Sequence, residues 1–191
     1  MKRIRCPLSE SEVRSLAAGD AVLLSGKVFT GRDRLHKYFA DGGRLPVSLA
    51  GGALYHCGPV VVGDSLSGWR VAAAGPTTSV RENPYEPALI AATGVRAIIG
   101  KGGMDSATLE ACAKFGCVYL QAVGGAAAVA AKAVKRVDGV HFLEEFGAAE
   151  AMWEFEMEDF PAIVALDAHG RSLFAETEES SLRRFRELAG L

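Results

Sequence analysis

The stretch VRAIIGKGGMDSATLEACAKFGCVYLQA, residues 95–122, determines the expected fold. Val95–Ile99 and Val118–Ala122 are short apolar runs typical of buried strands, and a helix-like segment lies between them. Asp105 or Ser106 is expected to cap that helix. A strand, a helix and a second strand in this order predict two parallel strands joined by a right-handed crossover.

The same alternation is expected downstream. A helix over 124–134, which is mostly alanine, should precede a strand at Val137–Phe142. Trp153–Glu158 alternates strictly and predicts a half-buried strand with one acidic face, and Ala162–Leu166 predicts another strand. The last helix should carry one apolar stripe, formed by Leu182, Phe185, Leu188 and Ala189.

Upstream of residue 75 the pattern is mainly β. Ala21–Leu24 and Lys27–Thr30 flank Ser25-Gly26, which predicts either a hairpin or a bulge. Asp33 is expected to cap a helix that runs through Phe39. Three further strands are expected, at Ala53–Tyr55, Val60–Val62 and Trp69–Ala74.

Composition limits the class of protein. The chain has 191 residues, 49% of them hydrophobic and 23% charged, and we expect one domain over residues 1–191. The net charge of −2 disfavours nucleic-acid binding, for which a basic stripe is normal. No apolar run approaches the ~20 residues of a membrane span, and the basic N-terminus lacks the apolar core of a signal peptide. A cytoplasmic protein is therefore expected.

The four cysteines do not form a metal-binding pattern. No C-x-x-C pair occurs, and no histidine lies near a cysteine at zinc spacing. Two of them are separated by four residues, without a third to complete an iron–sulfur motif. We expect reduced, buried thiols and no metal bound by this chain, with no role assigned to Cys57.

Polar side chains are concentrated on two glycine-bounded turns. Gly75-Pro76-Thr77-Thr78-Ser79-Val80-Arg81 follows one expected strand, and Gly100-Lys101-Gly102-Gly103 follows another. Ligands bind at the carboxyl ends of parallel strands, and hydroxyl, guanidinium and ammonium groups there would suit a small dianion. The alternative is that the hydroxyls satisfy the backbone of a turn and the lysine is a solvated charge.

A third polar segment is GRDRLH, residues 31–36. Arg32 stands at a helix N-terminus, where its charge opposes the helix dipole, so a substrate carboxylate is a reasonable partner for it. His36 is either a base or a structural histidine. No Ser–His–Asp triad is evident in the sequence.

Taken together, five motifs resemble the beta subunit of two-subunit class I fumarate hydratases, and they are also similar to the beta subunit of L(+)-tartrate dehydratase. The motifs are GRDRLH (31–36), GPTTSVR (75–81), IIGKGGM (98–104), VYLQAVGGAAA (118–128) and MEDFPAIVALDAHG (157–170). The resemblance covers nearly the whole chain. It implies an α/β fold, a swivelling β/β/α domain of three layers with a parallel sheet, an antiparallel sheet and helices.

The resemblance also implies site residues. Arg32 and Arg81 would bind the carboxylates of the substrate, together with Thr78. Thr77 would transfer the proton at the carbon next to a carboxylate, and Lys101 would bind substrate or tune that base. A threonine needs nearby cations and a dry pocket to act as a base.

The implied reaction is reversible hydration of fumarate to L-malate by a hydro-lyase. A partner alpha subunit would carry a [4Fe-4S] cluster on three cysteines, so activity would belong to the hetero-oligomer. The isolated chain is expected to self-associate, because a face built for a partner exposes apolar surface. Two alternatives remain open: tartrate in place of fumarate, and a binding module for dicarboxylates that has no catalytic role.

Overall fold

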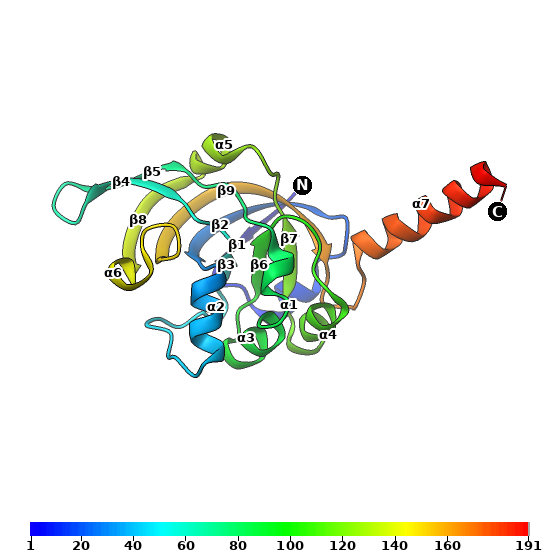
Figure 1. Ribbon diagram of the computed structural model, residues 1–191, viewed down its shortest axis with the longest axis horizontal. Coiled ribbons are helices and arrows are strands. Elements are labelled where there is room, and N and C mark those ends of the chain that lie inside the picture. Colours follow the sequence, from blue (N-terminus) through cyan, green and yellow to red (C-terminus); the bar gives the residue numbers. More distant parts are fainter. Residues whose placement is uncertain (191) are drawn as a thin grey trace.

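The computed structural model describes residues 1–190, which form a mixed sheet, a separate hairpin and seven α-helices (Figure 1). The strands are β1 (Lys2–Arg5), β2 (Ala21–Thr30), β3 (Ala53–Tyr55), β4 (Val60–Asp64), β5 (Gly68–Ala73), β6 (Ala97–Gly100), β7 (Val118–Gln121), β8 (Val134–His141) and β9 (Met152–Leu166). The helices are α1 (Glu10–Arg14), α2 (Asp33–Ala40), the 3-10 turn η1 (Ser79–Glu82), α3 (Glu86–Thr93), α4 (Ser106–Phe115), α5 (Ala127–Ala131), α6 (Leu143–Phe146) and α7 (Leu173–Ala189).

Five strands of the main sheet close into a ring. The sheet order is β1-β2-β3-β6-β7-β9-β8, with a further pairing between β2 and β9. The strands β2, β3, β6 and β7 pair in parallel, whereas β9 runs antiparallel to both β7 and β2. With its 15 residues, β9 is long enough to pair with β2 along one edge and with β7 and β8 along the other.

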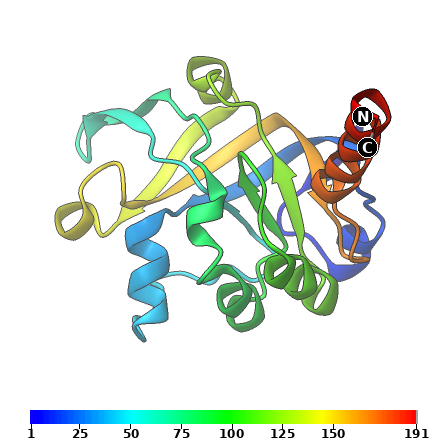
Figure 2. The same ribbon diagram turned by 45° about the vertical axis from the view of Figure 1, so that its right-hand side comes forward.

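Alternation along the strands divides the buried side chains into two cores. Tyr55 and Ile99 belong to the first core, which the ring encloses, and their neighbours Leu54 and Ile98 belong to the second. The second core lies beneath α2, α3 and α4, which cover one side of the strands (Figures 1 and 2). This α/β class, with parallel strands, a separate antiparallel pair and helices, confirms the expected fold class.

The structure decides one open alternative and corrects two expected boundaries. Ser25-Gly26 lies within the continuous strand β2, opposite a bulge in β9: Leu24 pairs with Phe160 and Gly26 with Met157, so two residues of β9 face Ser25. The bulge alternative is therefore confirmed for this strand pair, and the hairpin alternative fails. The two strands expected over 153–166 are one strand, because Asp159 (φ 51) bends the chain without ending its pairing. The alanine-rich helix is shorter than expected, since α5 spans only Ala127–Ala131.

Two further expectations need correction. The strand that follows α5 pairs antiparallel with β9 and therefore does not continue the parallel series. Arg32 occupies the N-cap position of α2 and Asp33 is its first helical residue, so Asp33 is not the cap. By contrast, Asp105 caps α4, where its carboxylate accepts a hydrogen bond from Thr108 N at 2.9 Å.

The helix α7 extends away from the rest of the chain (Figures 1 and 2). Its expected apolar stripe is exposed, with Leu182, Phe185 and Leu188 at 47%, 60% and 72% of full exposure. Among residues 1–190, no helix combines the length and the apolar character required to cross a membrane.

Gly26, which lies in β2 opposite the bulge of β9, gives a stability prediction. Its φ is +94°, and a Cβ at this position would lie 2.4 Å from the carbonyl oxygen of Cys6. We expect Gly26→Ala to lower the free energy of unfolding by about 3 kcal/mol, from backbone strain and steric overlap together. Urea denaturation measures this change.

Gly42→Ala is the matched control, because Gly42 has a similar φ of +91° and open space around it. It should cost only about 1 kcal/mol, the strain contribution alone. Equal costs for the two variants would contradict the steric argument.

Candidate active site

The two polar turns lie side by side and are joined through their backbones. Thr77 N donates to His56 O at 2.6 Å, and Lys101 N donates to Thr77 O at 3.1 Å. Ser79 N donates in turn to Lys101 O at 3.0 Å. The turn that follows β5 is therefore held between two segments: it bridges antiparallel to the residues after β3 and parallel to the residue after β6.

Thr77 and Arg81 are in direct contact. Arg81 Nη2 donates to Thr77 Oγ1 at 2.9 Å, because the turn η1 brings a residue four positions later back over the threonine. The same nitrogen lies 3.0 Å from a carboxylate oxygen of Asp33. The Arg81 side chain remains 45% exposed, so it is available to a ligand from solvent.

Lys101 lies on the neighbouring turn. It forms a parallel bridge with Thr78, and its stem runs past Gly124, where a Cβ would lie 3.2 Å from Lys101 Cδ. Within residues 1–190 its ammonium group makes no hydrogen bond or ion pair. The structure thus brings together Thr77, Thr78, Arg81 and Lys101, four of the five predicted site residues.

Arg32, the fifth, reaches the same region from the start of α2. A Cβ at Gly58 would lie 2.3 Å from Arg32 Nη1, so this glycine leaves the space that the guanidinium occupies. Gly58 follows Cys57, which bridges to Pro76 in the threonine turn. Arg32 Nη2 lies 3.2 Å from Glu150, and Arg32 Nε is buried without a hydrogen-bond partner. The guanidinium therefore keeps unused donor capacity.

His36 is fully buried, and the structure supports the structural alternative for it over a base that contacts substrate. Its Nε2 lies 3.1 Å from Glu86 and its Nδ1 lies 3.5 Å from Glu82. Burial opposes its positive charge, but the two carboxylates raise its pKa to about 9. Burial also opposes ionisation of Glu86, yet the histidines hold the pKa of that carboxyl at about 2.

Glu82 is buried, and neither of its carboxylate oxygens has a hydrogen-bond partner. Burial raises its pKa from 4.5 to about 7, more than the nearby His36 lowers it. Because the pKa of Glu82 is raised in the folded state, its protonated carboxyl contributes to the free energy of unfolding in full below about pH 4.5. This contribution is lost as pH rises to about 7.

We therefore predict that Glu82→Gln becomes more stable relative to wild type as pH rises from 4.5 to 7. Urea denaturation at several pH values measures the difference, and exposed Glu178→Gln on α7 is the control. A difference that stays flat across this interval would show that Glu82 titrates normally.

Several residues with a clear part in this geometry were not singled out from the sequence. Asp33 holds Arg81, although its position suggested only a cap. Glu150 approaches Arg32 from a loop far along the chain, and no local pattern could have paired them. Gly58 could have been noticed, since the segment HCGP follows β3 directly and contains a glycine.

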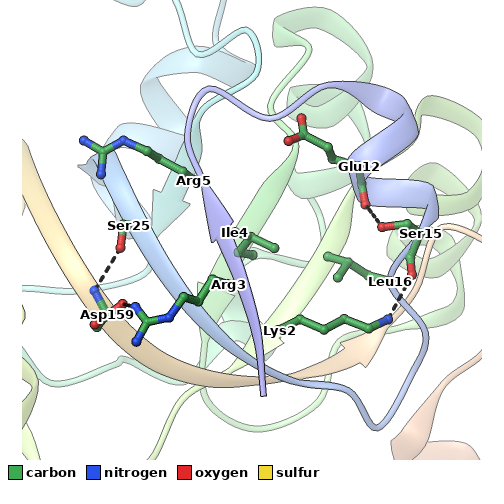
Figure 3. A pocket seen from close by; sticks show the side chains of 9 residues that line it. All are labelled: Lys2, Arg3, Ile4, Arg5, Glu12, Ser15, Leu16, Ser25 and Asp159. Atoms are coloured by element: carbon green, nitrogen blue, oxygen red, sulfur yellow. Dashed lines mark hydrogen bonds and ion pairs between the residues drawn. The ribbon is translucent and has the colours of Figure 1, made fainter.

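A separate pocket of about 510 Å³ lies beside β1 (Figure 3). Its basic side chains are already paired within the chain: Arg3 with Asp159, Arg5 with Glu156 at 2.9 Å. None of the predicted site residues lines it. We therefore place the candidate active site at the two turns and not in this pocket.

The thiols of the chain do not suit a metal cluster. Cys6 and Cys57 lie in the core enclosed by the ring, whereas Cys112 and Cys117 lie in the core beneath the helices. Burial raises the pKa of Cys6 and of Cys57 to about 12. Metal ligation uses thiolates, whose formation at Cys6 and Cys57 burial disfavours, and the four side chains lie in two separate places.

Comparison with known proteins places the chain in a family. The family described as Fumarase C-terminus matches residues 2–177. A Geobacillus stearothermophilus protein that carries the name fumarate hydratase class I is 47% identical over 181 residues, which are 95% of this chain and 35% of that protein. This chain thus spans about a third of that relative.

Two further relatives are similar to this chain over nearly their whole length. A Methanocaldococcus jannaschii protein carrying the name L(+)-tartrate dehydratase subunit beta is 42% identical over 96% of both chains. The L(+)-tartrate dehydratase subunit beta of Escherichia coli K12 is 36% identical over 94% of this chain and 90% of its own. The chain belongs to the Fumarase C-terminus family.

Proposed function

We propose that this chain is the beta subunit of a two-subunit iron–sulfur hydro-lyase that reversibly hydrates fumarate to L-malate in the cytoplasm. The observation that carries the proposal is the 2.9 Å hydrogen bond from the Arg81 guanidinium to Thr77 Oγ1. A cation that donates to a hydroxyl oxygen stabilises the alkoxide form, which a threonine needs in order to take a proton from carbon.

In the direction of dehydration, Thr77 Oγ1 would take the proton from the carbon next to one carboxylate. The electron pair of that C–H bond would form the double bond as hydroxide leaves the neighbouring carbon. In hydration, the Thr77 hydroxyl would return the proton to carbon. Arg81 donates to Oγ1 from the side, so the oxygen's remaining lone pair is free to face the substrate.

The two carboxylates of the substrate would be bound by Arg81 and Arg32, with Thr78 and Lys101 completing the site. Both arginines already face acids of the chain, Asp33 at 3.0 Å and Glu150 at 3.2 Å. A substrate carboxylate would offer them comparable, two-pronged partners. Lys101, which has no ionic partner among residues 1–190, would supply the uncompensated positive charge.

The lengths and names of the relatives support a partner subunit. The Geobacillus relative is nearly three times as long as its matched part, and the Methanocaldococcus and Escherichia relatives are named as subunits. The four thiols here are divided between two cores, so a [4Fe-4S] cluster would be held by an alpha subunit. Bound there, it would supply Lewis acidity to the departing hydroxyl.

The decisive assay is co-expression with an alpha-type chain under anaerobic conditions, followed by tests against fumarate, L-malate and L(+)-tartrate. We expect turnover of fumarate and L-malate by the complex and none by the isolated chain. An intact complex that turns over none of the three would refute the proposal.

The second candidate function is L(+)-tartrate dehydration, because two relatives that match the whole chain carry that name. The same groups would serve, since tartrate differs from malate by one additional hydroxyl. Turnover of tartrate alone in the same assay would establish this alternative.

Within the active complex, Thr77→Ala should lower kcat by about 10²- to 10⁴-fold, because the proton-transfer group is lost. The melting temperature of the chain should change little, since Thr77 is only partly buried and, within residues 1–190, its side chain hydrogen-bonds only to Arg81. Thr177→Ala, which removes a hydroxyl from exposed α7, is the control. Retention of normal kcat by Thr77→Ala would remove Thr77 from the reaction.

A further inference from the structure

A continuous series of buried polar side chains runs behind the candidate active site. The series begins at Arg32 O, which lies 2.9 Å from His36 Nδ1. The other ring nitrogen, His36 Nε2, lies 3.1 Å from Glu86 Oε2. The same carboxylate oxygen lies 3.1 Å from His56 Nε2, which is an ion-pair distance without the geometry of a hydrogen bond. On its other side, His56 Nδ1 lies 2.9 Å from Ser79 Oγ. Ser79 Oγ lies 3.0 Å from Tyr119 OH, and Tyr119 OH lies 2.9 Å from Gly102 O.

All five side chains of this series are fully buried, and we call them the buried chain: His36, Glu86, His56, Ser79 and Tyr119. They come from α2, from α3, from the residue after β3, from the turn η1 and from β7. No two of them are neighbours in sequence. Burying so many polar groups is unfavourable unless each one finds a partner, so the series constrains these segments relative to one another.

The two ends of the buried chain are attached to the site. At one end His36 Nδ1 donates to the carbonyl of Arg32, and at the other end Tyr119 OH donates to the carbonyl of Gly102, next to Lys101. In the middle, Ser79 belongs to the turn that carries Thr77 and Arg81. The buried chain therefore contacts the backbone of the segments that carry the side chains expected to bind substrate.

We propose that Ser79 and Tyr119 are positioning residues, which fix the distance between the Thr77 turn and the Lys101 turn through their buried hydroxyl–hydroxyl contact. The expected effect on catalysis rests on the proposed function, whereas the claim that the two hydroxyls hold the turns together does not. A charged carboxylate between the two histidines anchors the far end, so that His56 offers Nδ1 to Ser79 in a fixed orientation.

The fit around Ser79 shows how closely the two turns are held. A Cβ at Gly100 would lie 1.8 Å from Ser79 Oγ and 3.1 Å from Tyr119 OH. The hydroxyl of Ser79 thus occupies the space of a missing side chain on the adjacent strand. Any larger residue at position 100 would separate Thr77 from Lys101.

A metal ion is the competing explanation for the histidine end. The ligand atoms of His36, His56 and Glu86 lie within 4.8 Å of one another. The three groups are fully buried, and tetrahedral or octahedral coordination would require further ligands there. The contacts of His36 with Glu86 are, moreover, already those of a hydrogen-bonded ion pair.

The test is amide hydrogen exchange, measured by NMR on the full chain. The amides of Thr77, Ser79 and Lys101 make the backbone bonds that join the turns. We expect Ser79→Ala and Tyr119→Phe to accelerate exchange at Thr77 and Lys101 by about 10-fold, with the amides of β2 and β9 unchanged.

The matched control is Tyr55→Phe. Tyr55 is equally buried and also donates to a backbone carbonyl, that of Ala74, at 2.6 Å. Its loss should leave the Lys101 amide within about twofold of wild type. Unchanged exchange in Tyr119→Phe, or equal acceleration in Tyr55→Phe, would overturn the proposal. A stoichiometric metal ion found by elemental analysis of the purified chain would also overturn it.

The complex with an alpha subunit gives a second readout. Ser79→Ala and Tyr119→Phe should lower kcat with little change in KM, since substrate ligands are retained while their spacing relaxes. If the wild-type complex has no hydro-lyase activity, the proposed function fails, and the exchange experiment still decides whether the two hydroxyls hold the turns together.

Discussion

The pairing of β2 with β9 is the constraint on which the rest of the structure depends. Ala21 lies opposite Ile163 and Phe29 lies opposite Glu154, so segments from the two ends of the chain run together along most of β2. This contact turns an open sheet into a ring with an enclosed apolar core. Without it, the edge of β2 that faces β9 would be unpaired, while its other edge would still pair with β1 and β3.

A closed ring has rigid strand ends, and rigidity at those ends is what the polar turns require. The carboxyl ends of β3 and β6 are adjacent, and each passes directly into a segment of the candidate active site. Close packing is possible there because glycines stand where a side chain would collide, at Gly58 beside Arg32 and at Gly100 beside Ser79. The charges are also distributed unequally: Arg32 lies near Glu150 and Asp33, and Arg81 lies near Asp33. Lys101 has no ionic partner among residues 1–190.

The sequence predicted the parts of this arrangement that depend on local pattern. The parallel strands β6 and β7, the capping by Asp105 and the placement of Thr77 and Lys101 on turns after strands all follow from periodicity and glycine spacing. The ring was not predicted, because nothing near β2 specifies that its partner lies beyond residue 152. The buried chain was not predicted for the same reason. Its members are single polar residues in separate segments, and no local sequence pattern marks any of them.

The burial of the four cysteines has a consequence for the behaviour of the protein in air. Cys6 and Cys57 are 5% and 1% exposed, and Cys112 and Cys117 are fully enclosed. Oxidants attack the thiolate, and burial raises the pKa of Cys6, Cys57 and Cys117. The chain is thus resistant to sulfenylation and disulfide exchange while it stays folded. Oxygen sensitivity in any assembly that contains it must arise outside these four side chains.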